Sequence, residues 1–262
     1  MDFQSIIYTK DADGIATITL NRPEHNSMGG PMQGEWLQAV DDAEGDPNVR
    51  VLIITANGRH FSSGADPKEL DRQRGGTPGP GQGGPRRGVN QVLRMARFPK
   101  PYLGAINGSA VGGGMDFASL CDLRIASERA RFGMGYVRMG VIPGMGGCYL
   151  LPRIVGLQNA LKLIWTSEII DAQEALRIGY VSQVVPHEEL LPATRELALR
   201  LAKGPPLAIS WAKRLIYDGL RQGLEEALTA NEQAFALVQA SEDAREGPRA
   251  YVEKREPNFK GR

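Results

Sequence analysis

Two short segments that contain glycine could each turn a backbone N–H group toward a common point: residues 61–66, FSSGAD, and residues 111–116, VGGGMD. Backbone N–H groups that are held in place in a dry site stabilise negative charge as it develops on a carbonyl oxygen. The enolate of a thioester carries such a charge. We therefore predict that Ala65 and Gly113 donate hydrogen bonds to a thioester oxygen, although glycine runs also mark turns and close backbone packing that have no chemical role.

The residues around the second segment indicate how it is positioned. An apolar run at 101–107 precedes the three glycines, and residues 115–121 have the pattern of a helix start. A helix N-terminus brings a partial positive charge to the same spot. Asp116 falls in the first turn of this helix, where it could exchange a proton with the carbon next to the thioester or complement the free amides of the helix. The sequence leaves both roles open.

Composition narrows the class of protein. The 262 residues hold 31 Lys and Arg against 30 Asp and Glu, so no overall charge attracts the chain to nucleic acid or to an anionic membrane, and a phosphate group would need a local site. The N-terminus lacks the pattern of a signal peptide, and no apolar run reaches the roughly 20 residues that span a bilayer, which favours the cytoplasm. Cys121 and Cys148 have no metal-binding spacing, and we expect both in the core.

Periodicity predicts the elements that must position these residues. The pattern of buried strands occurs at 14–20, 50–55, 101–107, 122–126 and 180–185. The helical spacing of apolar residues occurs around 32–40 and then at 190–202, 206–219 and 224–240. Parallel strands joined by crossover helices make an α/β fold. We divide the chain into a core with the site, residues 1–190, and a helical region, residues 191–262.

Short motifs spread over nearly the whole chain match one known family. They are LNRPE at 20–24 with Asn26, FSSGAD at 61–66, PKP at 99–101, NG at 107–108, GGG at 112–114, CDLRIA at 121–126, IPGMGG at 142–147 and AYVEKR at 250–255. In their order and spacing they resemble the enoyl-CoA hydratase/isomerase, or crotonase, superfamily. The resemblance implies a spiral of ββα units with a helical C-terminal trimerisation region, and hence a homotrimer or a dimer of trimers.

The resemblance also implies a substrate that is carried as a coenzyme A thioester, with the two oxyanion donors at Ala65 and Gly113. It implies no cofactor beyond the coenzyme A of the substrate, and no metal. Three residues would lie near the coenzyme within one chain: Asn21, Arg22 and Lys68. Phe235 and Lys254 would reach it from an adjoining subunit. Without the resemblance, Lys254 would be interpreted as a solvated charge on a helix.

The chain departs from the family at the residues that carry out the chemistry. Well-known hydratases of the family use two glutamates, and the matching positions here are Asp116 and Tyr136. A phenol with a pKa of about 10 is a poor base at neutral pH, so Tyr136 would either donate a proton or hydrogen bond, or form a wall of the acyl pocket. We expect an enoyl-CoA hydratase or isomerase with Asp116 as the proton shuttle. The alternatives are an acyl-CoA decarboxylase or C–C hydrolase of the same superfamily, and an acyl-CoA-binding relative without activity.

Overall fold

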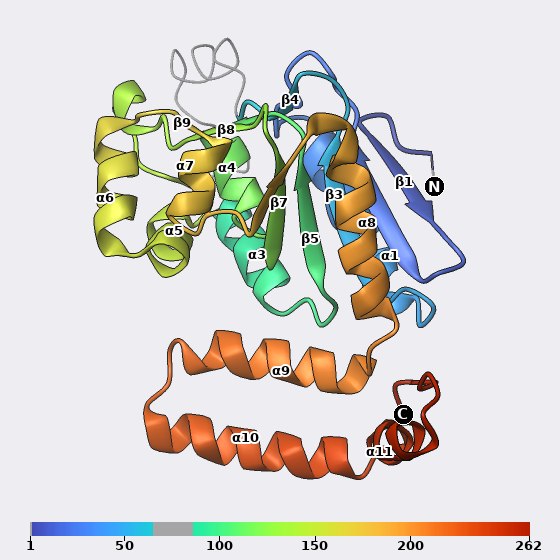
Figure 1. The fold of residues 1–262 in the computed structure, drawn as a ribbon. Helices are drawn as coiled ribbons and strands as arrows, with labels where there is room; N and C mark the ends of the chain where they lie inside the picture. The colour runs from blue at the N-terminus through green and yellow to red at the C-terminus, as the bar shows by residue number, and fades with distance from the viewer. Residues whose placement is uncertain (1, 65–85) are drawn as a thin grey trace.

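The computed structural model describes residues 2–64 and 86–262, and its strands form two sheets (Figure 1). The six-stranded sheet has the spatial order β1 (Ile6–Lys10), β2 (Ile15–Leu20), β3 (Val51–Ala56), β5 (Tyr102–Ile106), β7 (Leu123–Ser127) and β10 (Gln183–Val185). The four-stranded sheet has the order β4 (His60–Ser62), β6 (Ser109–Val111), β8 (Arg131–Gly133) and β9 (Ile170–Asp171). Every strand that the sequence predicts is present, and the α/β fold is confirmed.

The larger sheet is parallel except at its edge. β1 pairs antiparallel with β2 across a turn in which Gly14 takes a φ of 78°, a left-handed conformation that suits glycine. From β2 to β10 each pairing is parallel, so the chain must cross over between strands. Side chains alternate between the two faces of β3: Leu52 and Ile54 join one apolar cluster, while Ile53 joins another. The sheet is therefore covered on both faces.

One face is covered by α1 (Met32–Gly45), which buries Trp36. The indole N–H of Trp36 donates to the hydroxyl oxygen of Tyr102 at 3.1 Å, and its ring packs edge-on against Phe117 with the centroids 4.8 Å apart. Phe117 belongs to α4 (Gly113–Ala118). This aromatic contact anchors the short helix that carries Gly113 and Asp116 to the main core.

The opposite face is covered by α8 (Leu190–Ala202), whose Leu190 and Ala198 are buried in one cluster with Ile53 of β3 and Leu103 of β5. The first of the predicted C-terminal helices thus packs on the sheet. The division of the chain after residue 190 stays a prediction. On the side of the smaller sheet, α7 (Ala172–Arg177) packs on β8 and β9, and α5 (Gly147–Val155) packs on α6 (Leu157–Thr166). The helix α3 (Arg86–Ala96) lies lower in the view, next to the larger sheet (Figure 1).

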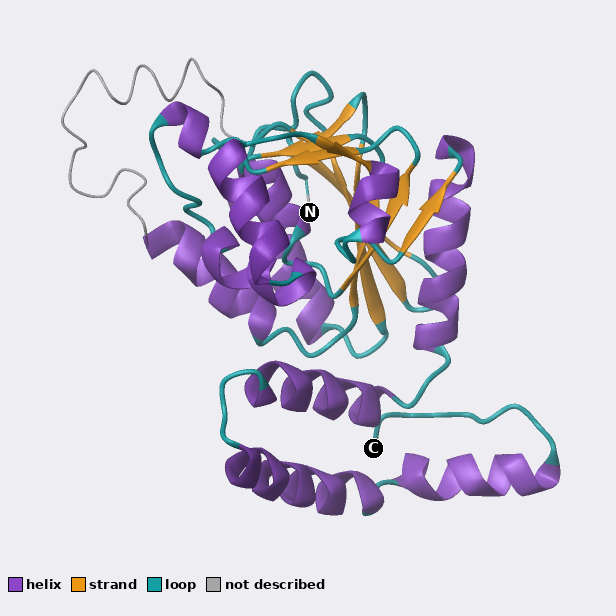
Figure 2. Ribbon diagram, turned by 60° about the vertical axis from the view of Figure 1, so that its left-hand side comes forward, coloured by secondary structure: helices purple, strands orange, loops and turns teal. Residues whose placement is uncertain are grey.

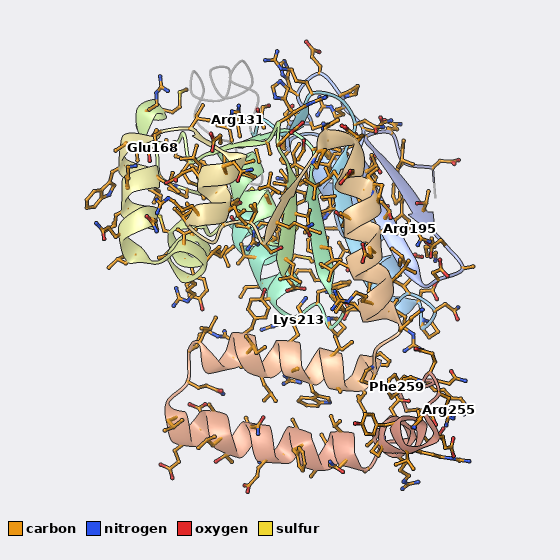
Figure 3. All side chains as sticks on the ribbon, viewed as in Figure 1. Arg131, Glu168, Arg195, Lys213, Arg255 and Phe259 are labelled. Atoms are coloured by element: carbon orange, nitrogen blue, oxygen red, sulfur yellow. The ribbon has the colours of Figure 1, made fainter. Side chains whose placement is uncertain are left out.

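Three helices form a separate layer below the sheets (Figures 1 and 2). They are α9 (Pro206–Gly219), α10 (Leu224–Gln239) and α11 (Glu242–Glu253). The carboxylate of Asp122 joins α9 to the core: it accepts hydrogen bonds from the Lys213 ammonium at 2.7 Å and from the Tyr217 hydroxyl at 2.8 Å. Figure 3 shows Lys213 between α9 and the sheets. No side chain of α9 is buried in the single chain, so this layer leaves apolar surface uncovered.

One sequence-based expectation about the core is wrong. Cys121 is buried as predicted, but Cys148 is exposed. The reason is helical spacing, because α5 buries Gly147, Leu151 and Val155, which recur every four residues on one side and leave position 148 outside. None of the helices among the described residues combines the length and the apolar character that a membrane crossing needs. The cytoplasmic location stays a prediction.

Candidate active site

The two glycine-bearing segments meet at Gly64 and Gly113. Gly64 has a φ of 79°, and a Cβ built on it would lie 2.7 Å from the backbone nitrogen of Gly113 and 2.8 Å from the carbonyl oxygen of Val111. Only glycine fits such an approach. Within the described residues no acceptor is bonded to the N–H of Gly113. Ala65, the other predicted donor, lies outside the described residues, so its part in the site stays a prediction.

Asp116 is fully buried in the first turn of α4, and its two carboxylate oxygens have different environments. Oδ2 accepts a hydrogen bond from the Tyr136 hydroxyl at 2.6 Å and another from the Met145 N–H at 3.2 Å. Oδ1 is buried and has no hydrogen-bond partner in the described part of the chain. The hydrogen bonds of the carboxylate go to Tyr136 and Met145, outside α4. Asp116 still lies in the first turn of α4, where its charge would also complement the helix dipole, so its catalytic role stays a prediction.

Burial raises the pKa of Asp116 to about 6, against the smaller lowering effects of the hydrogen bonds from Tyr136 and Met145. The pKa of Tyr136 is also raised, first by burial and then by the nearby Asp116 carboxylate. Tyr136 therefore keeps its proton and donates it in the hydrogen bond. With a pKa of about 6, Asp116 can change protonation close to neutral pH, which is a property that suits a general acid or base.

From the sequence, Tyr136 could either donate a hydrogen bond or proton or form a wall of the acyl pocket. The hydrogen bond that its hydroxyl makes in the structure supports the first of these roles. Tyr136 precedes the 3₁₀ turn at Val137–Met139 and is half-buried. Its hydroxyl reaches the carboxylate of Asp116, which lies 20 positions away in sequence. The structure thus brings together the two residues that stand where the family's hydratases have glutamates, and it makes Tyr136 a hydrogen-bond donor to Asp116.

Two of the predicted coenzyme-binding residues, Asn21 and Arg22, lie in the loop that follows β2. The side-chain oxygen of Asn21 accepts a hydrogen bond from Asn57 at 2.9 Å, and the Arg22 guanidinium is exposed. The buried amide of Asn26 holds this loop to the backbone oxygens of Asn57 and His60, both at 2.8 Å. The loop also touches the glycine segment, because the N–H of residue 28 donates to the carbonyl of residue 64 at 3.0 Å. Lys68 lies outside the described residues.

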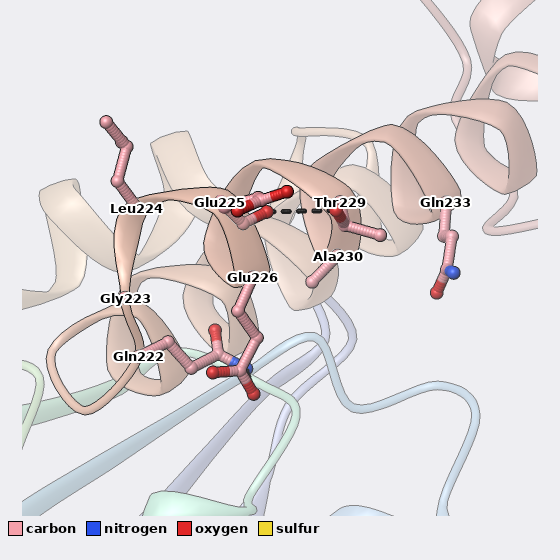
Figure 4. Close-up of a pocket in the computed structure, with 8 residues that line it drawn as sticks. All are labelled: Gln222, Gly223, Leu224, Glu225, Glu226, Thr229, Ala230 and Gln233. Carbon is pink, nitrogen blue, oxygen red and sulfur yellow. Dashed lines mark hydrogen bonds between the residues drawn. The ribbon is translucent and has the colours of Figure 1, made fainter.

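The other two predicted coenzyme-binding residues, Phe235 and Lys254, are not brought close to Asp116 within one chain. Phe235 is 61% exposed on α10, and Lys254 follows α11 with a left-handed φ of 53°. Both helices lie beyond α9 in both views (Figures 1 and 2). A hollow of about 700 Å³ at the start of α10 is lined by Glu225 and Glu226 (Figure 4) and holds no predicted site residue.

An apolar cavity of about 340 Å³, which Asp116 itself does not line, was not predicted from the sequence. Its lining side chains come from α3, α5 and α9 and from the end of α4; they include Val92, Leu120, Leu150 and Tyr217. Gly146 also lines it and directly follows Met145, whose N–H binds Asp116. No spacing in the sequence marks this cavity, because α4 ends at Ala118 and Leu120 lies outside the helix that carries Gly113 and Asp116.

Within the described ranges no group of His, Cys, Asp and Glu side chains could hold a metal ion. The polar groups that converge near Gly113 are a free backbone N–H and one carboxyl with a raised pKa. Such a pair can stabilise charge on an oxygen and move a proton at a neighbouring carbon.

Comparison with known proteins shows which family the chain resembles in sequence. Residues 10–262 match the enoyl-CoA hydratase/isomerase family. The chain is 37% identical over 248 residues to a probable enoyl-CoA hydratase of Bacillus subtilis, covering 94% of this chain and 95% of that protein. It is 34% identical over 264 residues to a trans-2-decenoyl-[acyl-carrier-protein] isomerase of Streptococcus mutans, covering 100% of both.

The fold agrees with these sequence matches. A crystal structure of enoyl-CoA hydratase from Bacillus anthracis superimposes with a TM-score of 0.93 at 34% identity, covering 99% of this chain and 100% of that one. The match to the family and the full-length relatives bear out the resemblance that the motifs suggested. The chain belongs to the enoyl-CoA hydratase/isomerase family, within the crotonase superfamily.

Proposed function

We propose that the protein stabilises the thioester enolate of an acyl-CoA substrate with the N–H groups of Ala65 and Gly113, and that Asp116 moves the proton. The observation that carries the proposal is the buried Asp116 carboxyl with a pKa of about 6, three residues along the helix from the free N–H of Gly113. Three residues correspond to about 4.5 Å along a helix axis. A thioester oxygen at Gly113 would thus have its α-carbon near the carboxyl.

Double-bond isomerisation is the reaction that needs the least from this site. The Asp116 carboxylate takes a proton from Cα of a 3-enoyl thioester, and the electron pair of the C–H bond moves into an enolate whose charge rests on the thioester oxygen. The same carboxyl then returns the proton to Cγ as the double bond settles between Cα and Cβ. One proton leaves and one returns, so no second carboxylate and no co-reactant is required.

Hydration is the second candidate, and the relative named as a probable hydratase supports it. In that reaction a water hydroxyl adds to Cβ of a 2-enoyl thioester, and Cα gains a proton. Asp116 would have to accept the proton of the water, because the Tyr136 hydroxyl is already bonded to Asp116 and its raised pKa makes it a poor base. The hydratase pair of glutamates is absent, so we place hydration after isomerisation.

The acyl chain would extend along α4 into the apolar cavity. Leu120 lines that cavity and stands two residues beyond Ala118, the last residue of α4. Apolar lining favours a hydrocarbon chain over a charged one. The cavity volume of about 340 Å³ supports a substrate with a chain longer than four carbons.

We also propose that the chain forms a trimer or a dimer of trimers, in which Phe235 and Lys254 of one subunit approach the coenzyme bound to another, alongside Asn21, Arg22 and Lys68. The uncovered layer of α9 to α11 supports an assembly, since it exposes large apolar side chains such as Leu224 and Phe235. Sedimentation of the purified protein measures this: a monomer at micromolar concentration would contradict it.

Incubation in deuterated water tests the proposed chemistry. A panel of acyl-CoA thioesters is treated with the protein and its Asp116→Asn variant, and the products are weighed by mass spectrometry. Isomerisation or Cα exchange adds deuterium, hydration adds water, and decarboxylation removes carbon dioxide. We expect deuterium incorporation that the variant loses. The 2-enoyl and 3-enoyl isomers are also separated by chromatography, because direct return of the abstracted proton moves the double bond without changing the mass. Binding with neither a mass change nor a moved double bond would support the non-catalytic relative, and equal turnover by the variant would remove Asp116 as the shuttle.

A further inference from the structure

The helix α5 begins with glycine at the point where it meets Asp116. A Cβ built on Gly147 would lie 2.2 Å from Oδ1 of Asp116, 2.9 Å from the Cβ of Pro143 and 3.2 Å from the Cε of Met134. The φ of Gly147 is not in the left-handed region, so its backbone conformation suits any residue. Space, and not conformation, is what excludes a side chain here.

Oδ1 of Asp116 therefore sits in a small notch formed by Gly147, Pro143 and Met134. Besides Oδ1, the atoms nearest to the position of the missing Cβ are carbons of Pro143 and Met134, and Oδ1 has no hydrogen-bond partner among the described residues. Both hydrogen bonds of the carboxyl go to Oδ2. An oxygen that is dry and unpaired disfavours the charged form of its carboxyl. The notch thus helps to explain why the buried Asp116 carboxyl keeps its proton up to a higher pH than an exposed carboxyl does.

The other groups around Asp116 do not offset this effect. Tyr136 donates to it, Tyr180 is buried with its hydroxyl on the backbone of α4, and Cys148 follows Gly147 on α5. None of these carries a positive charge. The guanidinium of Arg124 lies 5.1 Å from the centre of the Tyr180 ring and is bonded to backbone carbonyl oxygens. In the described part of the chain no cation pairs with the carboxyl.

We propose that Gly147 is a positioning residue of the site: because it lacks a Cβ, it leaves the space for Oδ1 of Asp116 and so keeps the carboxyl dry and on Tyr136. The proposal rests on the proposed role of Asp116 as the proton shuttle. A methyl group at position 147 pushes the carboxyl away from the notch, toward water, and off the Tyr136 hydroxyl. The proton shuttle then loses both its geometry and its raised pKa.

The test is the pH dependence of turnover in Gly147→Ala. We expect kcat to fall at least tenfold, with KM within about twofold of wild type, and the acidic limb of the kcat profile to move down from about pH 6, since a hydrated carboxyl returns toward its ordinary pKa of 3.8. The matched control is Gly34→Ala on the exposed side of α1, where an added Cβ meets no atom within 4 Å, and it should behave as wild type. A uniform loss of rate with an unmoved acidic limb would overturn the proposal.

A second pair of variants separates this proposal from the proposed function. In Asp116→Ala the oxygen is gone, so most of the fall in melting temperature that Gly147→Ala causes should disappear in the double variant. If Gly147→Ala does not fold, the double variant should fold; its failure to do so would refute the notch. If Asp116→Ala keeps full turnover, the role of Asp116 is wrong, whatever the melting temperatures show.

Discussion

Replacing Asp116 with Asn should abolish turnover and change how stability depends on pH. The free energy of unfolding of the variant, measured relative to wild type, should rise as the pH rises. The folded carboxyl has a pKa of about 6, raised from 3.8 by burial. In the pH range between these values the folded state binds the proton more tightly than the unfolded state, so wild-type stability falls as the pH rises through that range. Asn carries no titrating proton, and its contribution does not change with pH.

The size of the effect follows from the two pKa values. They differ by about 2.2 pH units (6 − 3.8), and each unit corresponds to about 1.36 kcal/mol. The whole effect is therefore about 3 kcal/mol, and because the unfolded carboxyl is already partly ionised at pH 4, the difference in free energy of unfolding between Asp116→Asn and wild type should grow by about 2.4 kcal/mol from pH 4 to pH 8. An amide hydrogen left unpaired beside Gly147 costs the variant stability at every pH, which shifts the whole curve and leaves its slope unchanged.

The assay is urea unfolding of both proteins at intervals from pH 4 to pH 8, at one protein concentration because assembly contributes to stability. The variant isolates Asp116, since all other titrating groups are common to the two proteins. A difference that stays flat across this range would refute the raised pKa. A difference that shrinks as the pH rises would show a carboxylate stabilised by its surroundings, and so a site unsuited to proton return.

Three further predictions test other parts of the site. In Tyr136→Phe the carboxylate of Asp116 loses a donor that favours its charged form, so the acidic limb of the kcat profile should move up by about 1 pH unit or more; a loss of rate with no movement would instead make Tyr136 the acid. Val92→Phe narrows the apolar cavity, and kcat/KM should fall about tenfold or more for long acyl chains while a four-carbon substrate is little affected. Lys254→Ala should raise KM for CoA thioesters several-fold with kcat unchanged, and an unaltered KM would remove this residue from the coenzyme site.

The central strands of the main sheet were predictable because they are long and buried, whereas the edge strand β1, whose residues are mostly exposed, was not predicted. Val51 to Ala56 is a continuous apolar run with every residue buried, which is the pattern of a central parallel strand. The smaller sheet was not predicted, because strands of two or three residues such as Ile170–Asp171 are too short to show a period. The helix α11 was also missed: it has no apolar stripe and contains Pro248, and its one clear signal is the Ser241 cap followed by acidic residues.

The site was predictable in its parts and not in its contacts. The glycine segments and the positions of Asp116 and Tyr136 came from local pattern and from the family resemblance. That the Tyr136 hydroxyl bonds to Asp116 depends on how the loop before α5 folds back onto α4, and no spacing encodes it. In the sequence Gly147 is only one residue of the IPGMGG motif. Its proposed role depends on Oδ1 of Asp116, which lies where a Cβ of residue 147 would be, and the sequence does not show that contact.

The central claim is that backbone N–H groups at Gly113 and Ala65 hold the oxygen of a thioester. Isotope-edited infrared spectroscopy of an acyl-CoA labelled with ¹³C at the thioester carbonyl measures this directly. Two hydrogen bonds from fixed donors weaken the C=O bond, so the carbonyl stretch of the bound ligand should shift to lower frequency than in water, and Asp116→Asn should keep that shift because the donors are backbone groups. A bound carbonyl that absorbs at its solution frequency or above would contradict the account.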